Sequence, residues 1–142
     1  MTAPERVPPA DAASAWVDAW SEGWANHDPA AIAARYAETC VFRSLPFRPA
    51  GRGRQAPLEY ARQSFAEEQS ARFAFGGPVV SDNGRAAVEY RAVITAADGS
   101  ITTIAGVSML RFGPDGLVTE HLDTWAEAPG DLGIAIRPEA PR

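Results

Sequence analysis

The hydrophobic pattern of this chain changes character once, at Gly76-Gly77-Pro78. Before that point apolar residues recur at the three- and four-residue spacing of amphipathic helices. After it come three runs typical of strands, Arg85 to Ala96, Ile101 to Phe112 and Leu117 to Trp125, with glycine-containing turns between them. Helices followed by an antiparallel meander predict a domain of the α+β class.

The N-terminal part predicts two helices in succession. The first spans Asp11 to Asn26, and its apolar stripe consists of Ala13, Trp16, Val17, Trp20 and Trp24. Asp28-Pro29 then supplies an N-cap and a first-turn proline for a short second helix. Ile32 and Tyr36 are predicted on the buried face of this second helix.

The segments that follow are assigned from their turn residues. Thr39 to Leu45 is a predicted strand and 46–53 a loop, after which Pro57 opens a third helix with Leu58, Ala61 and Phe65 at helical spacing. We interpret residues 1–10 as a disordered lead-in and 11–128 as the domain. The stretch 129–142 is rich in Pro and Gly, which indicates a tail that lies on the surface or on a partner.

Composition excludes several kinds of chemistry. All 13 basic residues are arginine, so Schiff-base formation, pyridoxal phosphate attachment and a P-loop lysine are excluded. The single Cys40 lies in an apolar run, which indicates a buried, inert thiol. His27 is the only histidine besides His121, and His121 with Asp123 alone supplies too few ligands for a metal. We expect neither a metal nor a cofactor.

Charge and length limit the partners. A net charge of −5 disfavours nucleic acid, which is bound by clustered cations. The four arginines between Arg43 and Arg54 are interpreted as a solvated loop with ion pairs, the alternative being a polyanion site. No apolar run approaches the ~20 residues of a membrane span, and residues 1–10 lack the pattern of a signal peptide. We expect one domain in the cytoplasm, without a membrane segment.

Turn lengths predict how the three strands pair, because a slip of one residue exchanges the faces of a strand. A two-residue loop at Asp98-Gly99 places Arg91 opposite Gly106. A turn that closes with Phe112 opposite Leu117 then places Gly106 opposite Asp123. In this register one face carries a polar cluster with one aromatic neighbour: Glu89, Arg91, Ser108, His121, Asp123 and Trp125.

The opposite face of the predicted sheet is apolar. It carries Val88, Tyr90, Ala92, Ile94, Val107, Met109, Val118 and Leu122. The residues leave two interpretations open. Either the polar face is solvated, as is common in antiparallel sheets, or it lies inside a concave sheet beneath the helices. Leu110, Phe112 and Trp125, which share the polar face, keep the second interpretation as open as the first.

Several segments together resemble the nuclear transport factor 2-like superfamily, in its SnoaL-like (polyketide cyclase-like) branch. They are the Trp-rich first helix ending at Asn26-His27-Asp28, Tyr36–Phe42 (YAETCVF), the Gly-Arg before the third helix, Gly106–Phe112 (GVSMLRF) and Asp115–Trp125 (DGLVTEHLDTW). The resemblance spans about Ala13 to Glu127 and depends on the order and spacing of these segments. It implies a cone-shaped α+β roll, in which a curved antiparallel sheet wraps around the N-terminal helices and a pocket opens at the wide end.

The resemblance also implies site residues and an assembly. It turns the polar face inward, and it implies a homodimer through the opposite, convex face. Asp123 matches the acidic position of the last strand that acts as acid or base in epoxide hydrolases and cyclases of this fold. Arg91 resembles the arginine of the epoxide hydrolases' Arg-x-Asp pair, but Val93 stands at the Asp position. Their water-holding Tyr and Asn correspond to Phe42 and Ser44, which disfavours epoxide hydrolysis.

The function that the sequence predicts is enzymatic: cofactor-free general acid/base chemistry, of the cyclase, isomerase or dehydratase type, on a small apolar organic molecule. Asp123 is the predicted base or acid, with Arg91 and His121 as further catalytic residues. The predicted substrate-binding residues are Trp20, Tyr36, Phe42, Ser44, Phe65, Glu89, Ser108 and Trp125. The alternative is a non-catalytic ligand-binding or accessory module, and a third option is a purely structural dimer domain.

Overall fold

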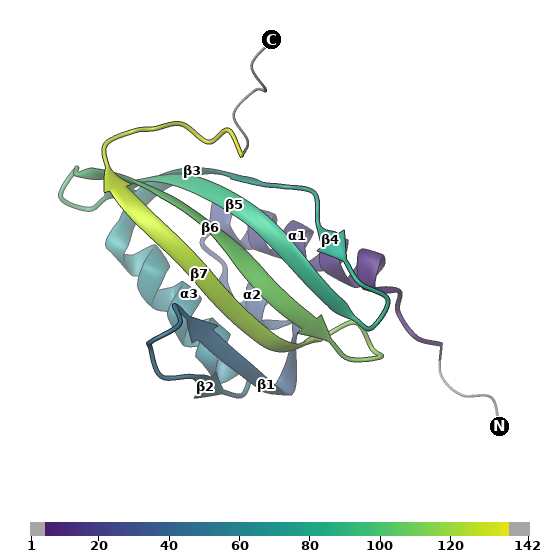
Figure 1. Ribbon diagram of the computed structural model, residues 1–142. Coiled ribbons are helices and arrows are strands. Elements are labelled where there is room, and N and C mark those ends of the chain that lie inside the picture. Colours follow the sequence, from purple (N-terminus) through teal and green to yellow (C-terminus); the bar gives the residue numbers. More distant parts are fainter. Residues whose placement is uncertain (1–4, 137–142) are drawn as a thin grey trace, which may run out of the picture.

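Helices precede the sheet in the computed structural model, which describes residues 5–136 (Figure 1). The helices are α1 (Pro9–Ala25), α2 (Pro29–Ala33) and α3 (Gln55–Glu67), and the strands are β1 (Tyr36–Ser44), β2 (Gly51–Arg52), β3 (Glu68–Phe75), β4 (Val79–Val80), β5 (Arg85–Ala96), β6 (Ile101–Phe112) and β7 (Val118–Pro129). All three helices lie on one face of a curved, open sheet. The prediction of an α+β fold with a sheet wrapped around N-terminal helices is confirmed.

The sheet has seven strands in the order β2-β1-β7-β6-β5-β3, and β4 pairs with β5. Its neighbouring strands are antiparallel apart from β1 and β7, which are parallel. The parallel pair places Phe42 beside His121 and Ser44 beside Asp123. The end of the first strand therefore reaches the same part of the sheet as the polar residues of the last strand.

Several elements differ from the sequence-based prediction; the short strands β2, within the predicted loop 46–53, and β4 are not predicted. Tyr36 is the first residue of β1 rather than part of a helix, because α2 ends at Ala33 and the backbone then pairs with β7, with Val118 N donating to Arg35 O at 2.9 Å. The sequence pattern does not predict β3 at all. This strand lies at the edge of the sheet beyond β5. Its only large apolar side chains are Phe73 and Phe75, which are too few for the alternation of a strand to be recognised.

The predicted register of β5 is wrong by one residue. The loop between β5 and β6 has three residues: Gly99 N donates to Ala96 O, and Ala96 N donates to Ser100 O, both at 2.9 Å. Gly99 has a φ of 86°, the left-handed conformation that such a loop requires. Tyr90, instead of Arg91, is therefore opposite Gly106. The slip exchanges the two faces of β5, so Tyr90 points into the cone, whereas Glu89 and Arg91 lie on its outer face.

The predicted register of β7 is wrong by two residues, which leaves its faces unchanged. A bulge lies between the pairs Arg111–Glu120 and Phe112–Val118, so Phe112 is opposite Val118 rather than Leu117. As a result Ser108 is directly opposite Asp123. Because the offset is an even number of residues, the polar side chains of β6 and β7 stay on one face, as predicted.

Arg91 binds the C-terminal segment on the outer face of the sheet instead of contacting Asp123. Its guanidinium donates to Leu132 O at 3.2 Å and to Ala135 O at 3.3 Å. The same segment is held by Thr103, which donates to Gly130 O at 2.7 Å, and by an Arg72–Asp131 ion pair at 3.0 Å. Residues 130–136 therefore cover part of the outer face. Of the two expectations for this segment, a tail on the surface or a tail on a partner, these residues agree with the first.

The N-terminal segment is also more ordered than the sequence suggests. Helix α1 begins at Pro9, two residues before the predicted start. Val7 N donates to Pro114 O at 2.9 Å, which ties the segment to the β6–β7 turn. Residues 1–4 of the expected lead-in and 137–142 of the expected tail lie outside the described residues.

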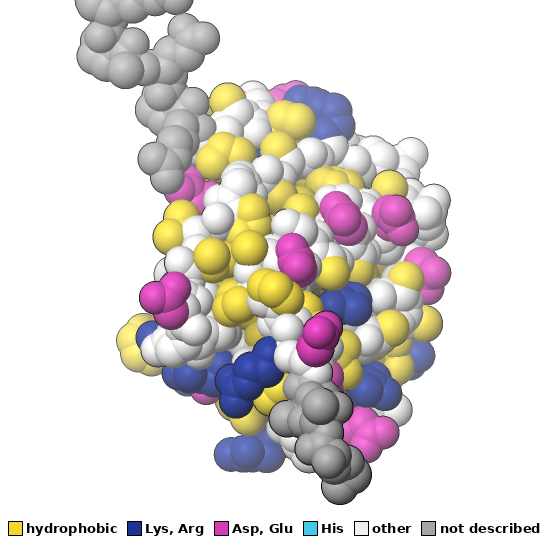
Figure 2. Space-filling model, turned by 90° about the vertical axis from the view of Figure 1, so that its right-hand side faces the viewer, with side chains coloured by type: hydrophobic (Ala, Val, Ile, Leu, Met, Phe, Trp, Pro, Cys, Tyr) yellow, Lys and Arg dark blue, Asp and Glu magenta, His cyan; other side chains and the backbone are white. Residues whose placement is uncertain are grey.

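The face shown in Figure 2 carries charges of both signs. Acidic side chains are scattered among apolar ones, and most of the arginines lie in the lower half of the view. Of the arginines between 43 and 54, Arg54 donates to Tyr36 O at 2.9 Å, and Arg48 lies over the Trp125 ring at 5.5 Å. Both arginines thus have partners within the fold, but these contacts are a backbone hydrogen bond and a cation–π contact rather than the expected ion pairs. No helix within residues 5–136 is long and apolar enough to cross a membrane.

Gly106, in the middle of β6, lets groups of β5 and β7 approach the backbone of β6 closely. A Cβ atom at this position would lie 2.5 Å from Thr124 O, 2.6 Å from Trp125 Cβ and 2.9 Å from the Tyr90 hydroxyl. We expect Gly106→Ala to lower the free energy of unfolding by about 1–3 kcal/mol in urea denaturation, because well-packed neighbours would have to shift. Gly77→Ala is the control: its Cβ would meet nothing within 4 Å, and a change within ~0.5 kcal/mol is expected. Equal effects of the two substitutions would contradict this account.

Candidate active site

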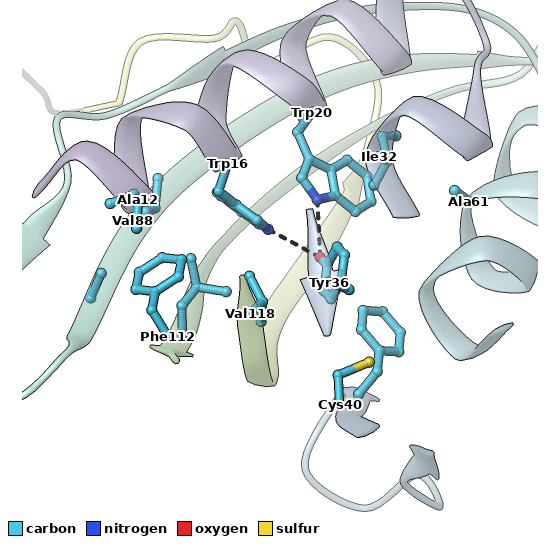
Figure 3. Packing of buried hydrophobic residues seen from close by; sticks show 14 of the residues in the cluster. Ala12, Trp16, Trp20, Ile32, Tyr36, Cys40, Ala61, Val88, Phe112 and Val118 are labelled. Carbon is cyan, nitrogen blue, oxygen red and sulfur yellow. Dashed lines mark hydrogen bonds between the residues drawn. The ribbon is translucent and has the colours of Figure 1, made fainter. Parts of the chain in front are cut away.

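A chain of buried hydrogen bonds begins at the Tyr36 hydroxyl (Figure 3). Two indole groups of α1 donate to this oxygen, Trp16 Nε1 at 3.0 Å and Trp20 Nε1 at 3.1 Å. The hydroxyl is also 2.7 Å from His121 Nδ1 on β7. The two tryptophans are four residues apart, so helical spacing presents both N–H groups to one acceptor.

The hydrogen count along this chain determines the tautomer of His121. An indole N–H can only donate, so the Tyr36 oxygen accepts twice and must use its own proton toward His121 Nδ1. Burial is the main cause that raises the pKa of Tyr36 well above its usual range, so the hydroxyl keeps this proton. Nδ1 is then an acceptor, and the imidazole carries its hydrogen on Nε2. This nitrogen donates to Asp123 Oδ1 at 2.6 Å.

The carboxylate of Asp123 is oriented mainly through one of its two oxygens. Ser108 Oγ also donates to Oδ1, at 2.6 Å, so this atom accepts two short hydrogen bonds, and the Tyr90 hydroxyl is a further hydrogen-bond partner of the carboxylate. The residue is buried but remains 7% exposed, and it lines a cavity. A carboxylate oriented by two short hydrogen bonds through Oδ1 presents Oδ2 in a defined direction.

Aromatic rings hold the imidazole of His121 in place. Phe42 packs edge-on against it, with ring centroids 4.8 Å apart, and Trp16 does so at 5.6 Å. The Tyr36 ring stacks on the imidazole at 5.8 Å. Of the predicted binding residues, Tyr36 and Phe42 thus support His121 from behind rather than form the cavity wall.

The cavity has a volume of about 460 Å³, within the range of small-molecule sites. Its wall is mostly aromatic and aliphatic, with polar groups at separate places. The residues that matter for the site are Trp16, Trp20, Trp24, Tyr60, Phe65, Glu68, Phe75, Tyr90, Ile94, Ile104, Ser108, His121, Asp123 and Trp125. Several indole and phenyl groups around one carboxylate favour a ligand with a large apolar surface.

Most of the predicted site residues come together here, but two do not. Trp20, Phe65, Ser108, His121, Asp123 and Trp125 line the cavity. Ser44 lies next to the wall and accepts a hydrogen bond from Trp125 Nε1 at 3.1 Å. Glu89 and Arg91 are excluded from the wall by the register of β5. The Arg91–Asp123 pair expected from the sequence is therefore replaced by a His121–Asp123 pair.

Tyr60, Glu68 and Tyr90 are among the cavity residues that the sequence-based prediction does not include. Burial raises the pKa of both tyrosines, and for Tyr90 the negative charge of Asp123 is the second cause. Both hydroxyls therefore stay protonated and can donate. The three-residue loop before Ser100 would have placed Tyr90 inside, had it been recognised from Ala97-Asp98-Gly99. For Glu68 and Tyr60 the sequence carries no comparable signal.

Two expectations about reactive groups can be compared with the described residues. Cys40 is buried in β1, and burial raises the pKa of its thiol, as expected of an inert cysteine. Within residues 5–136 no three side chains of the His, Cys, Asp and Glu types come together as a metal site would require.

Comparison with known proteins places the fold in the NTF2-like class. Three solved structures share it. An NTF2-like protein of unknown function from Exiguobacterium sp. 255-15 has a TM-score of 0.66 at 19% identity, over 78% of this chain and 98% of that one. An LEH-like epoxide hydrolase of M. tuberculosis has a TM-score of 0.65 at 14% identity, over 81% and 83%. SalBIII, an epoxide hydrolase/cyclase-like enzyme in pyran ring formation in the polyether salinomycin, has a TM-score of 0.71 at 16% identity, over 82% and 95%.

The family follows from the sequence itself. The model of the SnoaL-like domain matches residues 17–121, and the chain belongs to this family. A comparison with curated proteins finds no match. At identities of 14–19% the structural neighbours establish the fold but not a shared reaction.

Proposed function

We propose that this protein is an enzyme that uses cofactor-free general acid/base chemistry on a small, largely apolar organic molecule. The observation that carries the proposal is the Asp123 carboxylate, oriented by His121 and Ser108 at the wall of an aromatic cavity. A SnoaL-like family and neighbours named as an epoxide hydrolase and a cyclase-like enzyme support an activity of this general kind. We propose cyclisation, isomerisation or dehydration of a ketone-like substrate as the reaction type.

These reactions share one step that the site is suited to perform. Asp123 Oδ2 removes a proton from the carbon next to a carbonyl, and the C–H electron pair passes into the enolate. Tyr90, whose hydroxyl stays protonated beside the carboxylate, donates to the enolate oxygen. The proton on Oδ2 then returns to the same carbon, moves to another carbon or goes to a leaving oxygen, which restores the carboxylate. In a cyclisation the enolate carbon first attacks a second carbonyl carbon, and the proton goes to the oxygen of that carbonyl.

His121 has a different role in this proposal from the one expected from the sequence. Its Nδ1 is occupied by the Tyr36 proton and its Nε2–H by Asp123, so neither nitrogen is available to a substrate. We therefore propose His121 as a positioning residue for Asp123. Arg91 has no part in the proposed reaction because it binds the C-terminal segment.

The shared step can be tested before the natural substrate is known. 1-Indanone is a compact apolar ketone with acidic protons at C2. In D₂O the protein is expected to speed the replacement of these protons by deuterium, which is followed as loss of the C2 proton signal in NMR. The comparison is the same buffer with heat-denatured protein. A rate equal to this background, at a ketone concentration that saturates the cavity, would contradict the proposed chemistry.

The second candidate is a ligand-binding module without turnover. It is favoured by the complete pairing of the chain Trp20–Tyr36–His121–Asp123, which could serve structure alone. A cavity that binds 1-indanone, yet leaves its C2 protons at the background rate, would favour this candidate. The domain limits 11–128 and the cytoplasmic location remain predictions.

We further propose a homodimer through the outer face of β6 and β7. Residues 130–136 cover the face on the side of β5, but the part with Val107, Met109 and Leu122 is left open, and Met109 is 37% exposed.

Light scattering is expected to give about twice the 15.1 kDa of one chain. Met109→Glu should shift this mass to that of a monomer, because a charge would be buried unpaired. Val79→Glu, at an exposed position of β4, is the control, and monomeric wild type would contradict the proposal.

A further inference from the structure

Glu68 lines the cavity together with three other acidic residues, Asp123, Glu67 and Glu127, and has no part in the reaction proposed above. It is the first residue of β3, and its side chain is only 5% exposed. Oε1 accepts from Trp24 Nε1 at 2.7 Å and lies 3.4 Å from His27 Nε2. Among the described residues Oε2 is buried without a hydrogen-bond partner. A buried carboxylate oxygen without a partner is costly, so a bound molecule that pairs with it gains affinity.

Two of the cavity's carboxylates, those of Asp123 and Glu68, are linked through hydrogen bonds to successive turns of α1. Trp20 donates to the Tyr36 chain that ends at Asp123, whereas Trp24, one turn later, donates to Glu68. The two indole rings are 6.4 Å apart, close to the ~6 Å rise of four helical residues. Both carboxylates line the same cavity, so one small molecule can reach both.

We propose that Glu68 is a binding residue for a hydroxyl group at the far end of the substrate. A hydroxyl can donate to an ionised carboxylate and accept from a protonated one, so it suits Oε2 in either state. The last torsion of a glutamate side chain is soft, and a small rotation brings Oε2 to the cavity surface. The substrate class is then a compact apolar ketone that carries a hydroxyl group remote from its carbonyl. This inference rests on the proposed function in one respect, namely that the carbonyl group of the substrate lies at Asp123.

The surroundings of Glu68 agree with a polar group at the end of an apolar pocket. Burial is the main cause that raises the pKa of its carboxyl group. His27 stacks flat on Phe65 with ring centroids 4.9 Å apart, which holds the imidazole against Oε1. With Trp24 and His27 both directed at Oε1, only Oε2 is left for a ligand.

A matched pair of ketones tests this inference by binding alone. 5-Hydroxy-1-indanone carries a hydroxyl on the ring side opposite the ketone, and 1-indanone lacks it. We expect the hydroxy ketone to bind the wild-type protein about tenfold more tightly, as measured by calorimetry. In NMR spectra it should shift the Trp24 indole N–H signal more than 1-indanone does, while the Trp16 and Trp20 signals respond equally to both. Equal affinities, or no binding of either ketone, would overturn the inference.

Two variants connect the preference to Glu68. In Glu68→Leu the advantage of the hydroxy ketone should fall to within about twofold, with the affinity for 1-indanone unchanged. Unshifted Trp16 and Trp20 indole signals show that the cavity is intact. Glu68→Gln keeps an acceptor for Trp24, and in this variant the hydroxy ketone should still bind about threefold more tightly than 1-indanone. This result tests the role of Glu68 even if the leucine variant is unstable. A full tenfold advantage in either variant would refute the role of Glu68. The binding of the hydroxyl group needs no proton transfer. If deuterium exchange fails while the preference for the hydroxy ketone is intact, only the proposed reaction is refuted.

Discussion

Asp123→Asn is expected to lower the rate of 1-indanone deuterium exchange by about a hundredfold or more, as general bases typically contribute this much. Asparagine keeps the size of the side chain, and its carbonyl oxygen can still accept from His121 and Ser108. It cannot take up a proton at the position of Oδ2. The C2 proton signal is followed at several ketone concentrations, so that the rate at saturation is separated from binding.

The control for this prediction alters the orientation of the carboxylate instead of its basicity. Ser108→Ala removes one of the two hydrogen bonds to Oδ1 and leaves the base in place. We expect a loss of about tenfold, from a less well oriented base, with unchanged affinity for 1-indanone. Exchange by Asp123→Asn at the wild-type rate would exclude Asp123 as the base. Equal losses in both variants would indicate that the cavity as a whole, rather than proton transfer, is responsible.

The order of elements was accessible from the sequence because it depends on local patterns. The tryptophan stripe of α1, the Asp28-Pro29 helix start and the alternation after Gly77 are each read within a few residues. Asp28 does cap α2, with Ala31 N donating to its side chain at 3.2 Å. Such signals indicate which elements form, and the α+β class follows from their order.

The site was less accessible because it depends on register and on distant contacts. One extra residue in the Asp98-Gly99 turn places Tyr90 in the cavity instead of Arg91. The β propensity of the sequence is the same in both registers, so it does not distinguish them. An error of two residues in the next turn had no such effect on Asp123. The parallel pairing of β1 with β7 joins residues about eighty positions apart, and no local pattern indicates it. The role of Tyr36 depends on this pairing.

Tyr36→Phe is expected to have the largest effect on stability, a loss of about 3–6 kcal/mol in the free energy of unfolding. The hydroxyl serves three buried groups at once: two indole N–H donors and His121 Nδ1. Each would be left without a partner, and an unpaired buried polar group costs about 1–3 kcal/mol. Urea denaturation measures the loss. Tyr60→Phe, which removes a hydroxyl from the cavity wall, is the control, with an expected loss of about 1 kcal/mol.

A double-mutant cycle shows whether the loss comes from the unpaired donors. In the Tyr36→Phe protein the Trp20 N–H has nothing to donate to, so Trp20→Phe should cost at least ~1 kcal/mol less in that background than in the wild-type protein. The Tyr36→Phe protein should also lose the preference for hydrogen on His121 Nε2, visible in the ¹⁵N shifts of the ring. Additive losses, together with an unchanged tautomer, would mean that the hydroxyl does not orient His121. Asp123 would then be oriented by Ser108 and by an imidazole whose position does not depend on Tyr36.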